Sequence, residues 1–229
     1  VSFKVLTSII TYHVISTDDG NGINTTLNFN QTYLITGVDL IENLLFFTDD
    51  YNPPRVINVR PVGNRYPNPI AFIDQFDPNS ILVIKQPPIE SPTIVPILTS
   101  GQENFIDTRF ICFAYRYRYE DGEYSATSQW SAPAFIPKPF EFSPDNYLNN
   151  GMVNLYNAVQ ITYNSGGPLV KGIDLLFKQA SSNVIKVIEK LNKFDLGIPD
   201  NTNPTYVFDN SKIFTVLPDS ELLRLYDNV

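Results

Sequence analysis

Cysteine, histidine and basic residues are scarce in this sequence, and each scarcity excludes a kind of chemistry. The single cysteine, Cys112, cannot form an internal disulfide, and its apolar neighbours predict a buried structural thiol. The single histidine, His13, has no Ser or Cys motif around it from which a catalytic triad could be built. The 16 Lys and Arg are outnumbered by 24 Asp and Glu, which gives a net charge of −8. Tight binding to nucleic-acid phosphates needs a basic stripe, which this sequence lacks.

Signals for membranes, cofactors and catalysis are also missing. No apolar run is long enough for a membrane-spanning helix, and no signal peptide is visible, so we expect no membrane anchor. A phosphate loop, a dinucleotide fingerprint, zinc-ligand spacing and a nucleophile elbow are absent as well. We therefore expect no catalytic residue, no cofactor and no metal ion.

Two acidic stretches deserve a comparison with known cation and catalytic sites. Asp18–Gly22 (DDGNG) resembles the start of a calcium loop, but the later ligands and flanking helices of an EF-hand do not follow. It predicts a hairpin turn instead. Asp49 and Asp50 lie close to Arg55 in sequence. We expect Asp49 and Asn52 to cap a turn there, and Arg55 to pair locally.

Aromatic and β-branched residues are abundant, and they favour strands over helices. The sequence holds 13 Tyr and 16 Phe, and its apolar runs are short and separated by Gly, Pro, Asn and Asp. This predicts a mainly β protein with short antiparallel strands. A fibronectin III- or immunoglobulin-like sandwich is expected in residues 107–216, and a barrel- or propeller-like β piece in residues 1–85.

The remaining segments are expected to be a connector and a helix. Four prolines fall within Pro87–Pro96, so residues 86–106 are predicted to form a Pro-rich connector. Residues 217–229 are predicted to form a short C-terminal helix, with Asp219 and Glu221 in its first turn. Because the chain starts at Val1 and stops just after this helix, we expect it to be a segment of a longer polypeptide.

The stretch RYRYEDGEYSATSQWSAP predicts an amphipathic hairpin. Successive side chains of a strand point to opposite faces, so its tyrosines are expected over the core and its arginines outward. Asp121-Gly122 predicts a type I′ turn between the two strands. Exposed aromatic side chains here could also anchor an interface, where Tyr, Trp and Arg are favoured. The possible interface residues are Tyr115, Tyr117, Tyr119 and Trp130.

Two resemblances extend these expectations. YRYRYEDGEYSATSQWS resembles the last two strands of fibronectin type III-like sandwiches, and VQITYN, VKGIDLLFKQ, VIKVIEKL and YVFDN resemble earlier strands. A longer series is ENLLFFTDDYNPPRVINV, FAYRYRYEDGEYSATSQWSAPAF, VKGIDLLFKQ and LPDSELLRLYDNV. In this order the motifs resemble the muzzle, or tail nozzle, proteins of crAss-like podophages, viruses of gut bacteria, or a closely related tail protein of these phages.

The resemblance implies a structural role in the virion. Such a protein forms a ring of its own copies at the distal end of a short tail, next to other tail proteins and around the DNA exit channel. Genomic DNA would pass without sequence-specific binding, and no catalytic residue is implied. Two alternatives stay open. One is a carbohydrate- or receptor-binding β-module whose Tyr and Trp stack on sugar rings, and the other is a glycan-degrading tail enzyme with paired acids.

Overall fold

The computed structural model describes residues 27–30, 32–42, 44–58 and 78–222. The chain divides into two compact units, Val1–Ile84 and Lys85–Val229. Within the described ranges it consists of antiparallel sheets with only short helical turns, which confirms the prediction of a mainly β protein. His13 and Asp18–Gly22, for which the sequence analysis made predictions, lie outside the described residues.

The described part of the first unit is an open antiparallel sheet in the order β1-β2-β3. Its strands are β1 (Gly37–Ile41), β2 (Leu44–Thr48) and β3 (Arg55–Asn58). A 3-10 turn, η1 (Pro78–Ile81), follows later in the chain. Pro53 and Pro54 lie in the loop between β2 and β3, where a missing N–H costs no ladder bond. The sheet does not close on itself within this described part, so the barrel expected for residues 1–85 is not what these strands form.

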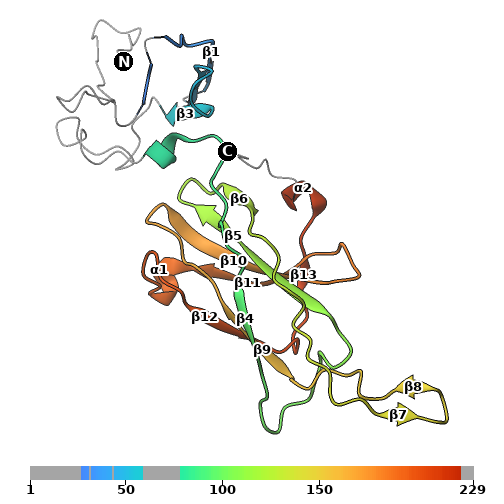
Figure 1. Ribbon diagram of the computed structural model, residues 1–229. Helices are drawn as coiled ribbons and strands as arrows, with labels where there is room; N and C mark the ends of the chain where they lie inside the picture. The colour runs from blue at the N-terminus through green and yellow to red at the C-terminus, as the bar shows by residue number, and fades with distance from the viewer. Residues whose placement is uncertain (1–26, 31, 43, 59–77, 223–229) are drawn as a thin grey trace, which may run out of the picture. The chain divides into compact units, whose positions relative to one another are not determined.

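The second unit is a two-layer sandwich (Figure 1). A five-stranded sheet has the order β13-β11-β10-β5-β6, and a three-stranded sheet has the order β12-β9-β4. The strands of the larger sheet are β5 (Ile111–Tyr119), β6 (Tyr124–Thr127), β10 (Val170–Gln179), β11 (Lys186–Asn192) and β13 (Thr215–Val216). Those of the smaller sheet are β4 (Thr93–Ile97), β9 (Ala158–Thr162) and β12 (Thr205–Phe208). Three short elements lie outside both sheets: the hairpin β7 (Phe142–Ser143) and β8 (Leu148–Asn149), and the helical turns α1 (Lys193–Leu196) and α2 (Asp219–Leu222).

The strands lie next to one another as in an immunoglobulin-like sandwich, but the chain visits them in another order. In that sandwich, strands A, B and E share one sheet, and C, F and G share the other. Here β4-β9-β12 match A-B-E, and β10-β5-β6 match C-F-G. The hairpin β5–β6, which matches F–G, precedes β9 instead of following β12. The arrangement of strands within the two sheets is therefore immunoglobulin-like, although the connections between the strands differ.

The Pro-rich stretch 86–106 is more than a connector. Its residues Thr93–Ile97 form β4, which pairs antiparallel with β9 and supplies one edge of the smaller sheet. Pro96 can take part because an edge strand has one row of backbone groups that needs no partner in the sheet. The sandwich thus begins earlier in the chain than the predicted start at residue 107.

The core between the two sheets is rich in aromatic rings. On β5, Phe113, Tyr115 and Tyr117 point inward, as the alternation predicted. Phe113 and Phe177 of β10 both contact Phe208 of β12, at ring-centroid distances of 5.2 and 5.0 Å. Edge-to-face and tilted aromatic pairs of this kind add to the gain from apolar burial. The two sheets are therefore held together by contacts between residues far apart in the sequence.

The turn between β5 and β6 is not the predicted type I′ turn. Only Gly122 has a positive φ, of 85°, and Asp121 is not among the described residues with positive φ. The Gly122 N–H bonds the Tyr119 carbonyl at 3.0 Å, and the Tyr119 N–H bonds the Glu123 carbonyl at 2.8 Å. This is the three-residue loop in which a type I turn is followed by a left-handed glycine. As expected, the turn needs a glycine at position 122 for its left-handed backbone. This glycine forms the bulge at the end of a three-residue loop instead of the second position of a two-residue turn.

A row of buried serines begins in β6 with Ser125 and continues the pairing of β5 beyond that strand. Ser125, Ser128 and Ser131 recur every third residue, whereas their partners on β5 recur every second residue. Each serine hydroxyl accepts the backbone N–H of one partner at 3.0–3.1 Å; the partners are Tyr117, Tyr115 and Phe113 in the same order. Each hydroxyl also donates to the carbonyl of the following residue. Three residues of the serine segment therefore face every two residues of β5, and each serine hydroxyl fills the gap that the extra residue leaves in the backbone pairing. The arrangement resembles a series of β-bulges.

We predict that Ser128→Ala destabilises the second unit by about 1–3 kcal/mol, because it leaves the buried Tyr115 N–H without its acceptor. Urea denaturation followed by tryptophan fluorescence measures the change. Ser182→Ala, which removes a hydroxyl from an exposed turn, is the matched control and should change stability by less than about 0.5 kcal/mol. Equal effects of the two substitutions would contradict the role of the serine row.

Candidate interaction surfaces

The four residues predicted as interface anchors do not share a surface. Tyr115 and Tyr117 lie in the core, where burial raises the pKa of both hydroxyls. Tyr119 is half-buried against the same core. Trp130 is half-buried on the other side of the larger sheet, with the Lys178 ammonium 4.5 Å from its ring centroid. An interface role is incompatible with the burial of Tyr115 and Tyr117, which instead hold the two sheets together.

Arg116 points away from the core, as predicted, but it is only 1% exposed. Its Nε and Nη2 donate to Asp174 Oδ2 on the neighbouring strand β10, at 3.1 and 2.9 Å. Its Nη1 donates to the Glu221 carbonyl at 3.2 Å, and Nη2 donates to Glu221 Oε2 at 2.9 Å. The Tyr124 ring lies 4.1 Å from the guanidinium. The outward direction was predicted correctly, but the side chain is buried because this face of the sheet is covered.

The cover is the segment that leads into α2. Leu217 packs against Leu176 and Val187 on the outer face of the larger sheet, and its N–H bonds the Ile185 carbonyl at 2.9 Å. This contact brings Glu221 over Arg116. Glu221 follows Leu217 by four positions in the chain, so this short segment combines an apolar contact with a charged one. The C-terminal segment is thus part of the folded unit.

We predict that Arg116→Ala destabilises the second unit by about 3–5 kcal/mol, because it leaves the Asp174 carboxylate buried without its partner. The double variant Arg116→Met/Asp174→Leu should recover most of this loss, since both charges are then removed together. Urea denaturation measures the cycle. Arg109→Ala, at an exposed position, serves as the control. If the double variant were less stable than Arg116→Ala, the proposed cause would be wrong.

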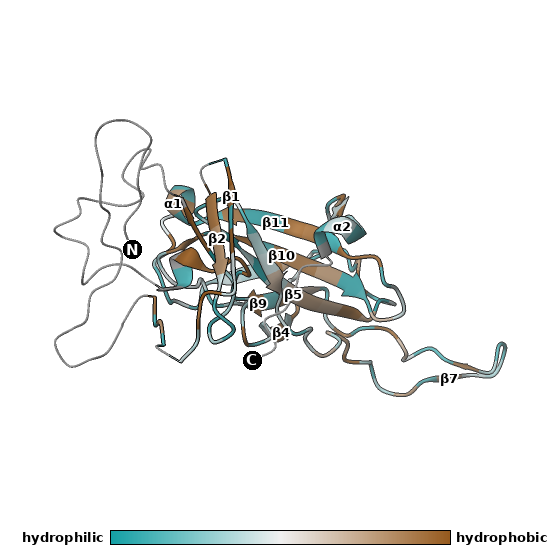
Figure 2. Ribbon diagram, turned by 90° about the horizontal axis from the view of Figure 1, so that it is seen from above, coloured by the Kyte–Doolittle hydropathy of each residue, from teal (hydrophilic) through white to brown (hydrophobic). Residues whose placement is uncertain are grey.

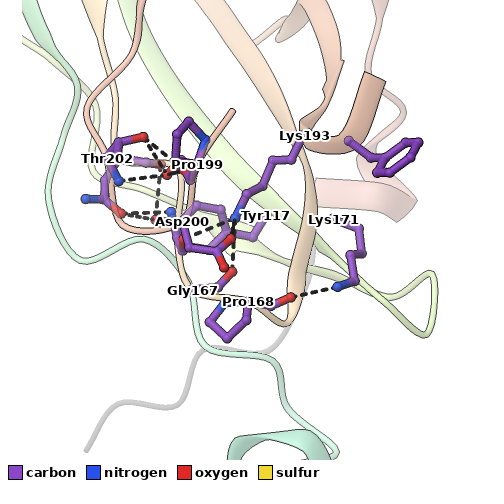
Figure 3. A network of polar contacts seen from close by, with 12 residues as sticks. Tyr117, Gly167, Pro168, Lys171, Lys193, Pro199, Asp200 and Thr202 are labelled. Carbon is purple, nitrogen blue, oxygen red and sulfur yellow. Dashed lines mark hydrogen bonds and ion pairs between the residues drawn. The ribbon is translucent and has the colours of Figure 1, made fainter. Parts of the chain in front are cut away.

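A buried lysine at the start of α1 links two loops at one end of the sandwich (Figure 3). The Lys193 ammonium donates to the carbonyls of Gly166 and Gly167 at 3.2 and 3.1 Å, and to Asp200 Oδ1 at 2.5 Å. Three acceptors match the three N–H groups of an ammonium. Lys193 is therefore saturated within its own chain, which makes it a structural link instead of a ligand-binding or catalytic group.

The acidic turn after β2 behaves as the sequence predicted. Asp49 Oδ1 accepts the backbone N–H groups of Tyr51 and Asn52 at 3.2 and 2.7 Å, and Oδ2 accepts the Asn52 side chain at 2.6 Å. The hydrogen bond of Arg55, in contrast, is not the local pairing that was predicted: its guanidinium donates to the carbonyl of Leu27, 28 residues earlier in the chain. Burial alone would raise the pKa of Asp49, but its own hydrogen bonds and the charge of Arg55 outweigh it, so the pKa is lowered.

We predict a measured pKa for Asp49 below its ordinary value of 3.8, obtained from the carboxyl ¹³C shift during an NMR titration. A lowered folded-state pKa means that the ionised carboxylate stabilises the fold. This contribution is complete above the unfolded-state pKa and is lost as the pH falls through the folded-state value. Asn52→Ala, which removes one donor, should move the pKa upward. A value at or above 3.8 in the unmodified protein would contradict the capping role.

Among the described residues, Cys112 and the acidic side chains show no arrangement for binding a ligand or metal. Cys112 is buried, and burial raises the pKa of its thiol, as expected for a structural cysteine. Within the ranges that the structure describes, no three His, Cys, Asp or Glu side chains gather closely enough to hold a metal ion. No helix in the described part of the chain is long and apolar enough to cross a membrane.

A hairpin arm projects from the sandwich. Residues 138–153, here called the arm, carry β7 and β8 and extend away from both sheets (Figures 1 and 2). Asn154 fixes the base of the arm, where its side chain accepts the Ile136 N–H and donates to the Ala134 carbonyl. These two bonds join the segment that enters the arm to the segment that leaves it. Farther out, the Asn149 side chain accepts the N–H groups of Glu141 and Gly151.

The arm has a defined conformation despite its short strands. A Cβ at Gly151 would lie only 1.9 Å from the Pro139 carbonyl oxygen, so glycine is required for the two sides to approach. Near the tip, the rings of Phe142 and Tyr147 meet edge to face with centroids 6.3 Å apart. The sequence analysis did not predict this arm. The Asn-rich turns at 145–146 and 149–150 were its available signal, but they lack the alternation that identifies longer hairpins.

Large apolar side chains along the arm face solvent. Phe140 is 75% exposed and Tyr147 is 82% exposed. Three more are over half exposed: Phe142, Leu148 and Met152. Singly exposed apolar residues are common on protein surfaces, whereas a group of them marks an interaction site. The arm is therefore the best candidate for an interaction surface in the second unit.

No protein-family profile matches the chain, and neither a curated protein nor a solved structure matches it. The ordered sequence motifs, the charge and the apolar arm are the observations on which a functional proposal can be built.

Proposed function

We propose that the chain is a structural, non-enzymatic part of a bacteriophage short tail, a muzzle or closely related tail protein. In this proposal its copies and neighbouring tail proteins surround the channel through which the genome leaves the virion. The observation that carries the proposal is the ordered series of motifs, which resembles the muzzle proteins of crAss-like podophages. The projecting arm supports it, because a ring of subunits needs a surface through which each copy contacts the next.

The positions of the motifs also support a structural role. ENLLFFTDDYNPPRVINV contains the hairpin β2–β3, and FAYRYRYEDGEYSATSQWSAPAF contains β5, β6 and the serine row. VKGIDLLFKQ is β10, and LPDSELLRLYDNV contains the segment that covers the outer face of the same sheet. The four motifs thus coincide with residues that form strands or cover the outer face of the larger sheet.

The charge of the chain agrees with a channel wall. A net charge of −8 repels the phosphate backbone, so DNA passing such a surface would not be held. The alternative of a carbohydrate-binding module depended on exposed Tyr and Trp rings. Because Tyr115 and Tyr117 are buried, they cannot stack on sugar rings, and the geometry favours the structural role.

We predict that purified virions of the phage that encodes this sequence contain the polypeptide in many copies. Mass spectrometry of the virions detects it, and cryo-EM should place it in a ring around the tail exit. A virion without the polypeptide would refute the proposal. Density on a peripheral fibre would instead favour host-surface binding, and glycan-array binding would be measured next.

A further inference from the structure

The arm exposes large apolar side chains, and the same unit carries an uncharged sheet face. Two-stranded hairpins are marginally stable in water unless their apolar side packs against something. The arm is anchored at Asn154, but its outer part exposes Phe140, Phe142 and Tyr147. Covering these rings would remove apolar area from water and hold the hairpin in place.

The outer face of the smaller sheet is uncharged across all three strands. Pairing places residues of β4, β9 and β12 in two rows on this face. The rows are Thr93–Thr162–Thr205 and Val95–Gln160–Val207. Val95 and Val207 are each about half exposed. Such a flat face of threonines and valines can accept aromatic rings without removing a charge from water.

A second copy of the chain supplies an apolar arm that suits this uncharged face. Copies with a net charge of −8 repel one another, so a contact between them is least opposed where the acceptor face carries no charge of its own. The uncharged rows of the smaller sheet provide such a place, and the arm contributes large apolar side chains to it. Both surfaces are present on every copy, which supplies each copy with one arm and one acceptor face.

The available area is that of a specific contact. Full burial of an aromatic side chain covers about 150–250 Å², and the exposed parts of the three rings amount to about two whole rings, so the rings could bury up to about 320–530 Å². Leu148 and Met152 add to this area. Stable interfaces bury about 800 Å² on each partner. The arm is therefore large enough to form most of one side of such an interface.

We propose that the arm of one copy lies across the outer face of the β4–β9–β12 sheet of the next copy. The arm and the acceptor face are different surfaces, so the contact is head-to-tail and can be repeated around a ring. This inference rests on the proposed function, because it names the contact through which the copies assemble.

The first test compares two identical substitutions. Sedimentation velocity of the full chain over a concentration series should show self-association, and Phe140→Ser should weaken it by about 30-fold, as expected for an interface anchor. Phe194→Ser is the matched control, because Phe194 is 92% exposed on α1, outside the arm. It should change the association by less than about twofold. Absence of self-association, or equal effects of the two substitutions, would overturn the proposal.

The second test identifies the acceptor face by disulfide trapping. The native Cys112 is buried, so single introduced cysteines can be oxidised selectively. A mixture of the Tyr147→Cys and Val207→Cys variants should form a covalent heterodimer. The control mixture pairs Tyr147→Cys with Val184→Cys, at an exposed site in the turn before β11. Equal trapping in both mixtures would exclude the smaller sheet as the acceptor.

The two proposals can fail separately. If the copies associate through the arm but virions lack the polypeptide, the tail function is wrong and the contact stands. If virions contain the polypeptide but the Phe140→Ser variant assembles into particles like the unmodified protein, the contact is wrong and the tail function stands.

Discussion

The burial of β5 on both faces is the constraint on which the second unit depends. Its inner face supplies Phe113, Tyr115 and Tyr117 to the core between the sheets. Its outer face carries Arg116, whose charge is compensated by Asp174 and Glu221 instead of by water. A charged group can be buried at this position only if every donor finds an acceptor, which requires the C-terminal segment to cross the sheet. The strand thus couples residues more than a hundred positions apart.

The same strand explains the row of serines that begins in β6 and continues beyond it. Because β5 is covered on both faces, the N–H groups on its β6 side are out of contact with water. They must find acceptors in the segment that runs beside β5. The spacing of one serine in three provides hydroxyl acceptors where the backbone geometry no longer matches. The segment can then leave the sheet at Ala134 and enter the arm. Pairing along β5 therefore positions the base of the arm.

The sequence predicted much of the fold and little of the candidate interaction surface. Aromatic and β-branched runs indicated the strands, and Pro53 and Pro54 marked a loop correctly. The alternation also separated Tyr117 from Arg116. It could not indicate that Arg116 is covered, since alternation reports which face a residue lies on and not what lies above that face. The arm was missed because two-residue strands leave almost no periodic signal.

What the sequence determined by itself was therefore local: the strand content, the position of the turn at Gly122, the cap at Asp49 and the inward direction of the tyrosines. These features follow from backbone preferences and from hydrogen bonds between residues close in the chain. Tertiary structure alone decided which sheet faces are buried, in which order the strands lie and which apolar side chains stay exposed. Those outcomes depend on contacts between distant residues, because burial is a property of the neighbours that the fold brings to a residue and not of the residue itself.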